Sequence, residues 1–202
     1  VLAYAILGMS GLRREEALAV RPIDVREEST YSYVTGESVR TMVVDVRRTW
    51  TERGGLSERT KNDHSARTVP VLPSMRGDLA RILAEGRVAA ADEEAWAGSP
   101  IVDHAGRNWN RVWRAALGSA GVRYIPPDML RHTTDTLMLA AGVAPDVDDK
   151  IHGRSEHTST YRNYFRPDVG VAEDAMRRMD GLLNVRPATG DSVTGRSADD
   201  TA

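Results

Sequence analysis

The chain has 202 residues, a net charge of −2 and no cysteine, and 41% of its residues are hydrophobic. This length favours one domain with a core of its own. The lack of cysteine excludes disulfides, thiolate nucleophiles and thiolate metal sites, and no apolar run approaches the length of a membrane span. We therefore expect a cytoplasmic protein without a membrane anchor.

The N-terminal half predicts helices followed by a small sheet. Residues 1–21 predict two helical segments broken at Ser10-Gly11, and their apolar start resembles the end of a core helix. We therefore expect a fragment that has lost an N-terminal domain. Two segments rich in β-branched residues predict strands, 41–50 and 66–72. Residues 27–38 predict an irregular surface insertion.

The C-terminal half predicts helices throughout. Apolar residues recur at helical spacing over 75–90, 108–120, 128–141, 145–152, 158–164 and 169–183. Gly142 stands where a helix C-cap is expected. The fold class is therefore mostly α with a small antiparallel β-sheet (α+β). We expect one domain over 1–185 and a mobile tail over 186–202.

Four residues spread along the chain could together serve a phosphodiester: Arg13, Lys61, Arg131 and Tyr164. Arginines hold non-bridging phosphate oxygens well, because the planar guanidinium matches two oxygens at once. A tyrosine can attack phosphorus and form a covalent intermediate, and a lysine can protonate the leaving oxygen. Basic residues also outnumber acidic ones over 40–67, which predicts a local basic patch for phosphate contacts.

Each of these residues also has a plain structural interpretation. Arg13 could pair with Glu16 on a surface helix, and Arg131 could pair with Asp135 one turn later. The lysine could be a solvated turn residue, and the tyrosine an aromatic anchor of the core. Only the order and setting of the four residues together point to a shared site.

The motifs around these residues resemble those of the tyrosine recombinase (phage integrase) family over nearly all of residues 2–184. GLRREEAL resembles the first-arginine box, TKNDHSARTVP the β-hairpin lysine segment, SPIVDHAGRNWNRVWRAAL the following linker and helix, LRHTTDTLMLAAG the second-arginine box and GRSEHTSTYRNYF the tyrosine box. The resemblance implies a tyrosine recombinase catalytic-domain-like fold and catalytic roles for the four residues. Glu16 stands where the family commonly has an acidic residue that supports the first arginine.

The resemblance also implies a reaction and a partner. It implies site-specific recombination or integration of double-stranded DNA through a 3′-phosphotyrosine intermediate, without metal or cofactor, in a phage, plasmid or integrative element. The active assembly would be a homotetramer on two DNA sites, formed from a monomer in solution, and the missing domain would be a helical core-binding domain. The predicted helix over 169–183 could pack on a neighbouring protomer or on its own domain.

Two positions depart from the family pattern. The family usually has histidine where this chain has Asp128, and histidine or tryptophan where it has Arg154. Asp128 is also a good helix N-cap, and Arg154 can donate to a phosphate but cannot act as a base at neutral pH. His152 is a nearby candidate substitute. His132 matches the common RHT sequence of the family, and we expect it to be structural.

These departures leave other functions open. One alternative is a catalytically degenerate DNA-binding relative of the recombinases. Another is a type IB topoisomerase-like enzyme, which shares the chemistry, and a third is an unrelated helical protein whose motifs match by chance. His104 and His157 have no partner pattern that predicts a metal site.

Overall fold

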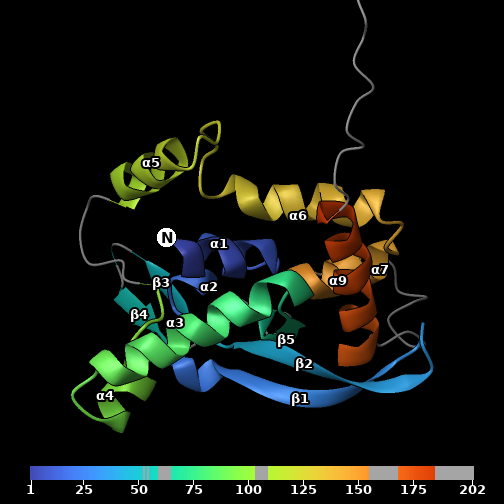
Figure 1. The fold of residues 1–202 in the computed structure, drawn as a ribbon, viewed down its shortest axis with the longest axis horizontal. Helices are drawn as coiled ribbons and strands as arrows, with labels where there is room; N and C mark the ends of the chain where they lie inside the picture. Colours follow the sequence, from blue (N-terminus) through green and yellow to red (C-terminus); the bar gives the residue numbers. More distant parts are fainter. Residues whose placement is uncertain (52, 54, 59–64, 103–108, 155–167, 185–202) are drawn as a thin grey trace, which may run out of the picture.

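A computed structural model describes residues 1–51, 53, 55–58, 65–102, 109–154 and 168–184. It confirms the mixed α+β class, with helices around a small antiparallel sheet (Figure 1). The three-stranded sheet has the order β1-β2-β5, formed by β1 (Val25–Ser32), β2 (Glu37–Val46) and β5 (Arg67–Pro70). Two short strands, β3 (Thr49–Thr51) and β4 (Gly55–Ser57), pair as a separate hairpin.

The described helices follow the predicted segments closely. They are α1 (Leu2–Met9), α2 (Arg14–Ala17), α3 (Arg76–Ala89), α4 (Glu93–Gly98), α5 (Trp109–Ser119), α6 (Met129–Ala140), α7 (Pro145–His152) and α9 (Val169–Leu183), with 3₁₀ turns η1 (Pro22–Asp24) and η3 (Pro73–Met75). Only α4 was not predicted, and Gly142 has the positive φ of +68° expected after α6. The predicted helix over 158–164 and the tail over 186–202 lie outside the described residues. No helix in the described ranges is long and apolar enough to cross a bilayer.

The predicted irregular insertion over 27–38 is wrong, because most of it belongs to a β-hairpin. β1 pairs with β2 along its whole length, from Val25 opposite Val44 to Ser32 opposite Glu37. Gly36 turns the chain between the strands with a φ of +73°. β1 gave no period-2 apolar signal because it is an edge strand of which only Ser32 is buried. Backbone pairing rather than side-chain burial therefore defines this strand.

The predicted basic patch over 40–67 is partly neutralised by this hairpin. Arg40 pairs with Glu27 at 2.6 Å, and Arg48 pairs with Asp24 at 2.6 Å. Both acidic partners precede the stretch in sequence, so a count of charges within 40–67 missed them. The antiparallel pairing of β1 with β2 brings these acidic residues beside the arginines.

Packing in the core fixes the relative positions of α1 and α6, the two helices next to the candidate functional site. α1 is buried on most of its surface and contacts α6. The two helices approach closely at Gly8, where a Cβ atom would lie 2.9 Å from Leu130 Cδ1. Tyr4 packs edge-on against the buried ring of Trp113 on α5, with ring centroids 5.7 Å apart. The C-terminal end of α1 is thereby held against the start of α6.

The last helix, α9, packs on its own domain, which was one of the two alternatives for residues 169–183. In Figure 1 it crosses the end of the sheet beside α7, and it contacts α6, α7, β1 and β5. Its Asp174 accepts hydrogen bonds from Ser32 Oγ at 2.6 Å and from the Tyr33 N–H at 2.7 Å. Its buried Glu173 accepts from Thr41 Oγ1 at 2.7 Å. These buried, hydrogen-bonded carboxylates fix where α9 packs on the β1–β2 hairpin and which of its residues face the hairpin.

Candidate functional site

The two predicted arginines, Arg13 and Arg131, meet at two backbone turns. Arg131 donates from Nη1 to the Gly11 carbonyl at 2.7 Å and from Nη2 to the His152 carbonyl at 2.5 Å. Arg13 donates from Nη2 to the Gly153 carbonyl at 3.2 Å. The structure therefore brings together residues that lie 120 and 140 positions from their partners in the sequence.

Glycine is required in both turns. Gly11 has a φ of +85° and Gly153 a φ of +57°, a region that side chains with a Cβ rarely adopt. A Cβ on Gly11 would also lie 3.1 Å from Ile151 Cγ2. The turns after α1 and α7 can therefore approach closely because Gly11 and Gly153 have no side chain. This contact places the carbonyls of the two glycines within reach of the arginines.

A third arginine, Arg67 on β5, lies beneath the other two and was missed by the sequence analysis. Its side chain is 0% exposed and forms an ion pair with the 1% exposed Glu16 at 2.9 Å. It also donates from Nε to the Ile151 carbonyl at 2.6 Å. The available signal was its position two residues before Val69 on a strand, because both side chains must point to the same, buried face. An arginine on such a face indicates a buried ion pair.

Glu16 binds two of the arginines at once. Its Oε1 accepts from Arg13 Nη1 at 3.0 Å, and its Oε2 accepts from the Arg13 backbone N–H at 2.8 Å. Burial alone would raise the pKa of Glu16, but the hydrogen bond and charge of Arg67, followed by those of Arg13, hold the pKa below its ordinary value. The expected contact between Arg13 and Glu16 is thus present, and it belongs to a larger network.

The cluster carries more positive than negative charge. Within the described residues, Arg13 and Arg67 share the carboxylate of Glu16, and Arg131 is near enough to feel its charge without an ion pair to it. Burial, followed by repulsion from Arg13 and Arg67, lowers the pKa of Arg131 to about 10. A guanidinium whose charged form is disfavoured in this way gains free energy from any anion placed beside it. The arrangement is therefore suited to hold an anion such as a phosphate.

The structural interpretation in which Arg131 pairs with Asp135 is wrong, because the described structure has no ion pair between them. Asp135 instead accepts from Arg154 Nη2, with its Oδ1 at 2.5 Å, and lies 3.2 Å from His152 Nε2. One helical turn separates Arg131 and Asp135 on α6, but Arg131 turns toward the carbonyls while Asp135 turns toward α7. The two residues do lie one turn apart on α6 as expected, but their contacts with other elements determine which partner each one binds.

Arg154 is held by carboxylates on two helices. It contacts Asp135 on α6, together with Asp148 at 3.0 Å and Asp149 at 3.4 Å on α7. Burial opposes its charge, but the hydrogen bond to Asp135 and the neighbouring carboxylates raise the pKa of Arg154. This guanidinium is thus neutralised by acidic partners, in contrast to Arg131. Its predicted role in holding a phosphate would require at least part of these contacts to break.

Two other candidate residues lie on the surface. Asp128 is exposed and occupies the predicted N-cap position of α6, but its side chain forms no cap hydrogen bond in the described structure. It has helical dihedral angles (φ −64°, ψ −19°), whereas an N-cap is usually extended. His132 is 69% exposed and lies 3.9 Å from Asp135. His152 is buried, and its backbone carbonyl, rather than its ring, contacts Arg131.

We expect Gly153→Ala to lower the free energy of unfolding by about 2–4 kcal/mol, since it adds a steric clash to a strained backbone. The new Cβ would lie 2.7 Å from Arg67 Nη1, at a φ of +57°. Gly142→Ala is the matched control, because Gly142 has a φ of +68° with nothing within 4 Å of the added Cβ. It should lose only about 1 kcal/mol. Urea denaturation measures both values, and equal losses would show that the Arg67 contact is unimportant.

The predicted general acid and nucleophile, Lys61 and Tyr164, lie outside the described residues. Ser65, which belongs to the lysine segment and is described, accepts from Arg13 Nη1 at 3.5 Å. The described geometry is therefore that of an arginine cluster held by Glu16 and by the carbonyls of two backbone turns. No family model, curated protein or solved structure matches this chain.

Proposed function

We propose that the chain is the catalytic domain of a tyrosine-type site-specific DNA recombinase. The observation that carries the proposal is the meeting of Arg13 and Arg131 at two backbone turns beside Arg67, with Glu16 shared by Arg13 and Arg67. An excess of half-buried guanidinium groups is unfavourable unless an anion completes the site. A DNA phosphate is the anion that the motif order and the chemistry of the arginines both favour.

Each residue has a defined step in the proposed reaction. Arg13 and Arg131 hold the non-bridging oxygens of the scissile phosphate and stabilise the charge that develops on them. The Tyr164 hydroxyl gives up its proton to solvent as its oxygen attacks phosphorus, forming the new P–O bond while the bond to the 5′ oxygen breaks. Lys61 donates a proton to that leaving oxygen. Attack by a 5′ hydroxyl of another strand reverses these steps, rejoins the DNA and frees the tyrosine.

A pool of nicked DNA duplexes with randomised sequence tests the proposal whatever the target site is. A nick next to the scissile phosphate lets the 5′ fragment diffuse away, so the covalent intermediate accumulates. We expect the chain to retain a subset of duplexes through denaturing washes, and sequencing should reveal a consensus. Tyr164→Phe should retain none above background, because it lacks the nucleophilic oxygen. Equal retention by the parent and Tyr164→Phe would overturn the proposal.

The contacts of Arg154 support a second candidate, a DNA-binding relative that does not cleave. Arg154 is engaged by Asp135, Asp148 and Asp149, and an exposed carboxylate stands at Asp128. This candidate predicts duplex binding by the parent without an adduct. It also predicts that the double variant Asp128→His, Arg154→His gains adduct formation.

A further inference from the structure

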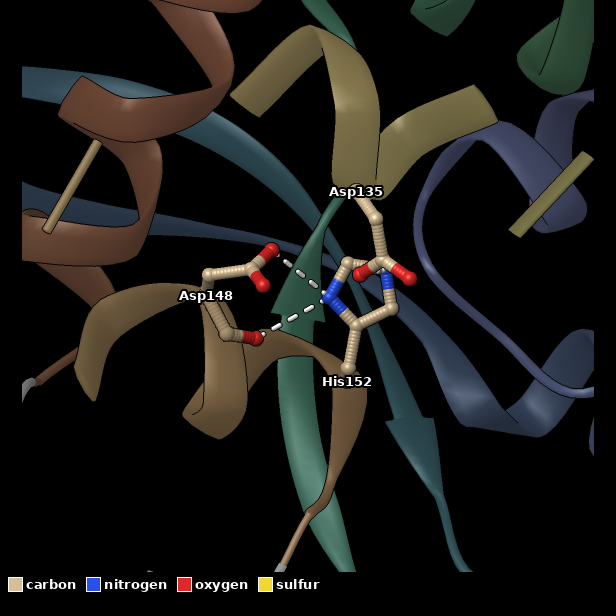
Figure 2. A group of neighbouring side chains, drawn as sticks. All are labelled: Asp135, Asp148 and His152. Carbon is tan, nitrogen blue, oxygen red and sulfur yellow. Dashed lines mark hydrogen bonds and ion pairs between the residues drawn. The ribbon is translucent and has the colours of Figure 1, made fainter. Parts of the chain in front are cut away.

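A second cluster of polar side chains lies beside the arginine site, between α6 and α7. It consists of Asp135, Asp148 and His152, and one ligand atom from each lies within 4.8 Å of the others. Figure 2 shows the Asp148 carboxylate joined by a dashed line to one ring nitrogen of His152, with the Asp135 carboxylate overlapping the ring in this view. Asp148 and His152 are four residues apart on α7, so they share a face of the helix. Asp135 completes the group from α6.

The hydrogen bonds of His152 leave one ring nitrogen without a partner. Its Nδ1 lies 3.0 Å from the Asp148 carbonyl oxygen and 2.9 Å from Asp148 Oδ1. Both oxygens only accept, so Nδ1 carries the donated proton (Figure 2). In the neutral ring, Nε2 then has no proton and carries a lone pair. Nε2 is buried and has no hydrogen-bond partner among the described residues, although Asp135 Oδ1 lies 3.2 Å away. Two lone-pair atoms this close repel each other unless a cation lies between them.

The surrounding charges also favour a cation. Among the described residues in mutual contact here, Asp135, Asp148 and Asp149 face the guanidinium of Arg154. This group is net negative while His152 is neutral. The carboxylate side chains are only 15–22% exposed, so solvent compensates the excess poorly. A divalent cation would restore the balance.

We infer that Asp135, Asp148 and His152 bind a divalent transition-metal ion, with Zn²⁺ the best fit. Tetrahedral Zn²⁺ has nitrogen and oxygen ligands at about 2.0–2.2 Å, which sets neighbouring ligand atoms about 3.3 Å apart. The 3.2 Å from Nε2 to Asp135 Oδ1 matches this spacing. Asp148 Oδ1 lies at Nδ1, so Asp148 would ligate through Oδ2, which now accepts from Arg154 at 3.0 Å. The bond from Nδ1 to a backbone carbonyl is the one that commonly orients a metal-bound histidine. One nitrogen with carboxylate oxygens selects against Mg²⁺, which prefers oxygen ligands.

The ion competes with Arg154 for the same carboxylates. Metal binding displaces the guanidinium from Asp135 and Asp148, since one carboxylate cannot serve both cations fully. The freed Arg154 carries its charge next to the site of Arg131, whose pKa already responds to it. The metal therefore acts on the position of Arg154 and takes no part in the phosphodiester chemistry. Metal binding itself does not depend on the proposed recombinase activity.

Zn²⁺ titration calorimetry on the DNA-free chain, with Co²⁺ absorption as a second readout, tests this inference. The parent should bind one ion, while Asp135→Asn and His152→Gln should each weaken binding by about 100-fold or more. Asp149→Asn is the matched control, because Asp149 contacts Arg154 but is not a proposed ligand. Its affinity should change by less than about threefold. Arg154→Met should bind about tenfold more tightly, since it removes the competing cation.

The variants separate this site from its alternatives. If Asp135→Asn and His152→Gln bind Zn²⁺ as well as the parent, the ion sits elsewhere, for example on exposed His132, and the inference is overturned. If Arg154→Met binds Zn²⁺ no more tightly than the parent, the inference is also overturned, because Arg154 then does not compete with the ion for Asp135 and Asp148. Circular dichroism of each variant verifies folding. The gain expected for Arg154→Met cannot arise from misfolding.

Discussion

Arg131→Lys should slow formation of the covalent DNA adduct by about 100- to 1000-fold. The guanidinium of Arg131 is the one whose pKa is lowered, to about 10, by burial and by the neighbouring arginines, so it gains most from a bound phosphate. Lysine keeps the charge but loses the planar pair of donors that matches two phosphate oxygens. Loss of a single preorganised donor of this type has effects of this size on catalysis. The measurement is the single-turnover rate on a duplex selected from the randomised pool.

Stability must be separated from catalysis in this variant. Lysine can satisfy one of the two carbonyls that Arg131 now binds, so the free energy of unfolding should fall by only about 1 kcal/mol. Arg178→Lys is a control, since Arg178 is exposed on α9. It should leave the adduct rate unchanged within about twofold. If Arg131→Lys keeps more than a tenth of the parent rate, the arginine cluster is not the phosphate site.

Glu16→Gln should have the largest effect on stability, lowering the free energy of unfolding by about 3–5 kcal/mol. Glu16 is the shared partner of Arg67 and Arg13, and Arg67 is fully buried. Removing one member of a buried pair leaves the other charge uncompensated in a medium that solvates it poorly. Glu15→Gln is the matched control, because Glu15 is the exposed neighbour. Urea denaturation at pH 7 measures both, and similar small losses would show that the pair is unimportant.

The same pair makes a prediction about acid stability. The folded pKa of Glu16 is held below its ordinary value of 4.5 by the two arginines, despite burial. Ionised Glu16 therefore contributes stability that is present above about pH 4.5 and is lost as the pH falls through the lower, folded pKa. Glu16→Gln lacks this contribution, so the difference between parent and variant should shrink in acid. A difference that stays constant from pH 7 to pH 3 would contradict the assignment.

The helices were predictable because their signals are local. The apolar spacing over 128–141 and 145–152, with Gly142 between them, predicted α6 and α7 almost to the residue. The edge strand β1 escaped because its sequence has almost no buried face, and its partner β2 defines it. Local periodicity reports burial of a face, so an element held mainly by backbone pairing gives little signal.

The site was predicted less completely than the helices for a related reason. Arg13 and Arg131 were identified from motif order, and the structure places them together. Arg67 and the acidic partners of Arg154 were missed, because their roles come from contacts across the fold. Asp135 illustrates the limit: its spacing suggested Arg131 as partner, yet the packing of α6 on α7 gave it Arg154. Spacing finds neighbours on one helix, whereas the choice of ion pair depends on the elements packed around it.

Mapping the covalent adduct by mass spectrometry shows whether the arginine cluster serves a tyrosine nucleophile. The adduct from a selected duplex is digested with nuclease and protease, and the peptide that carries the nucleotide is sequenced. We predict a single modified residue, Tyr164, bound to a 3′ phosphate. An adduct on another residue such as Tyr161, a 5′ linkage, or no adduct from a chain that binds the duplex would contradict the account.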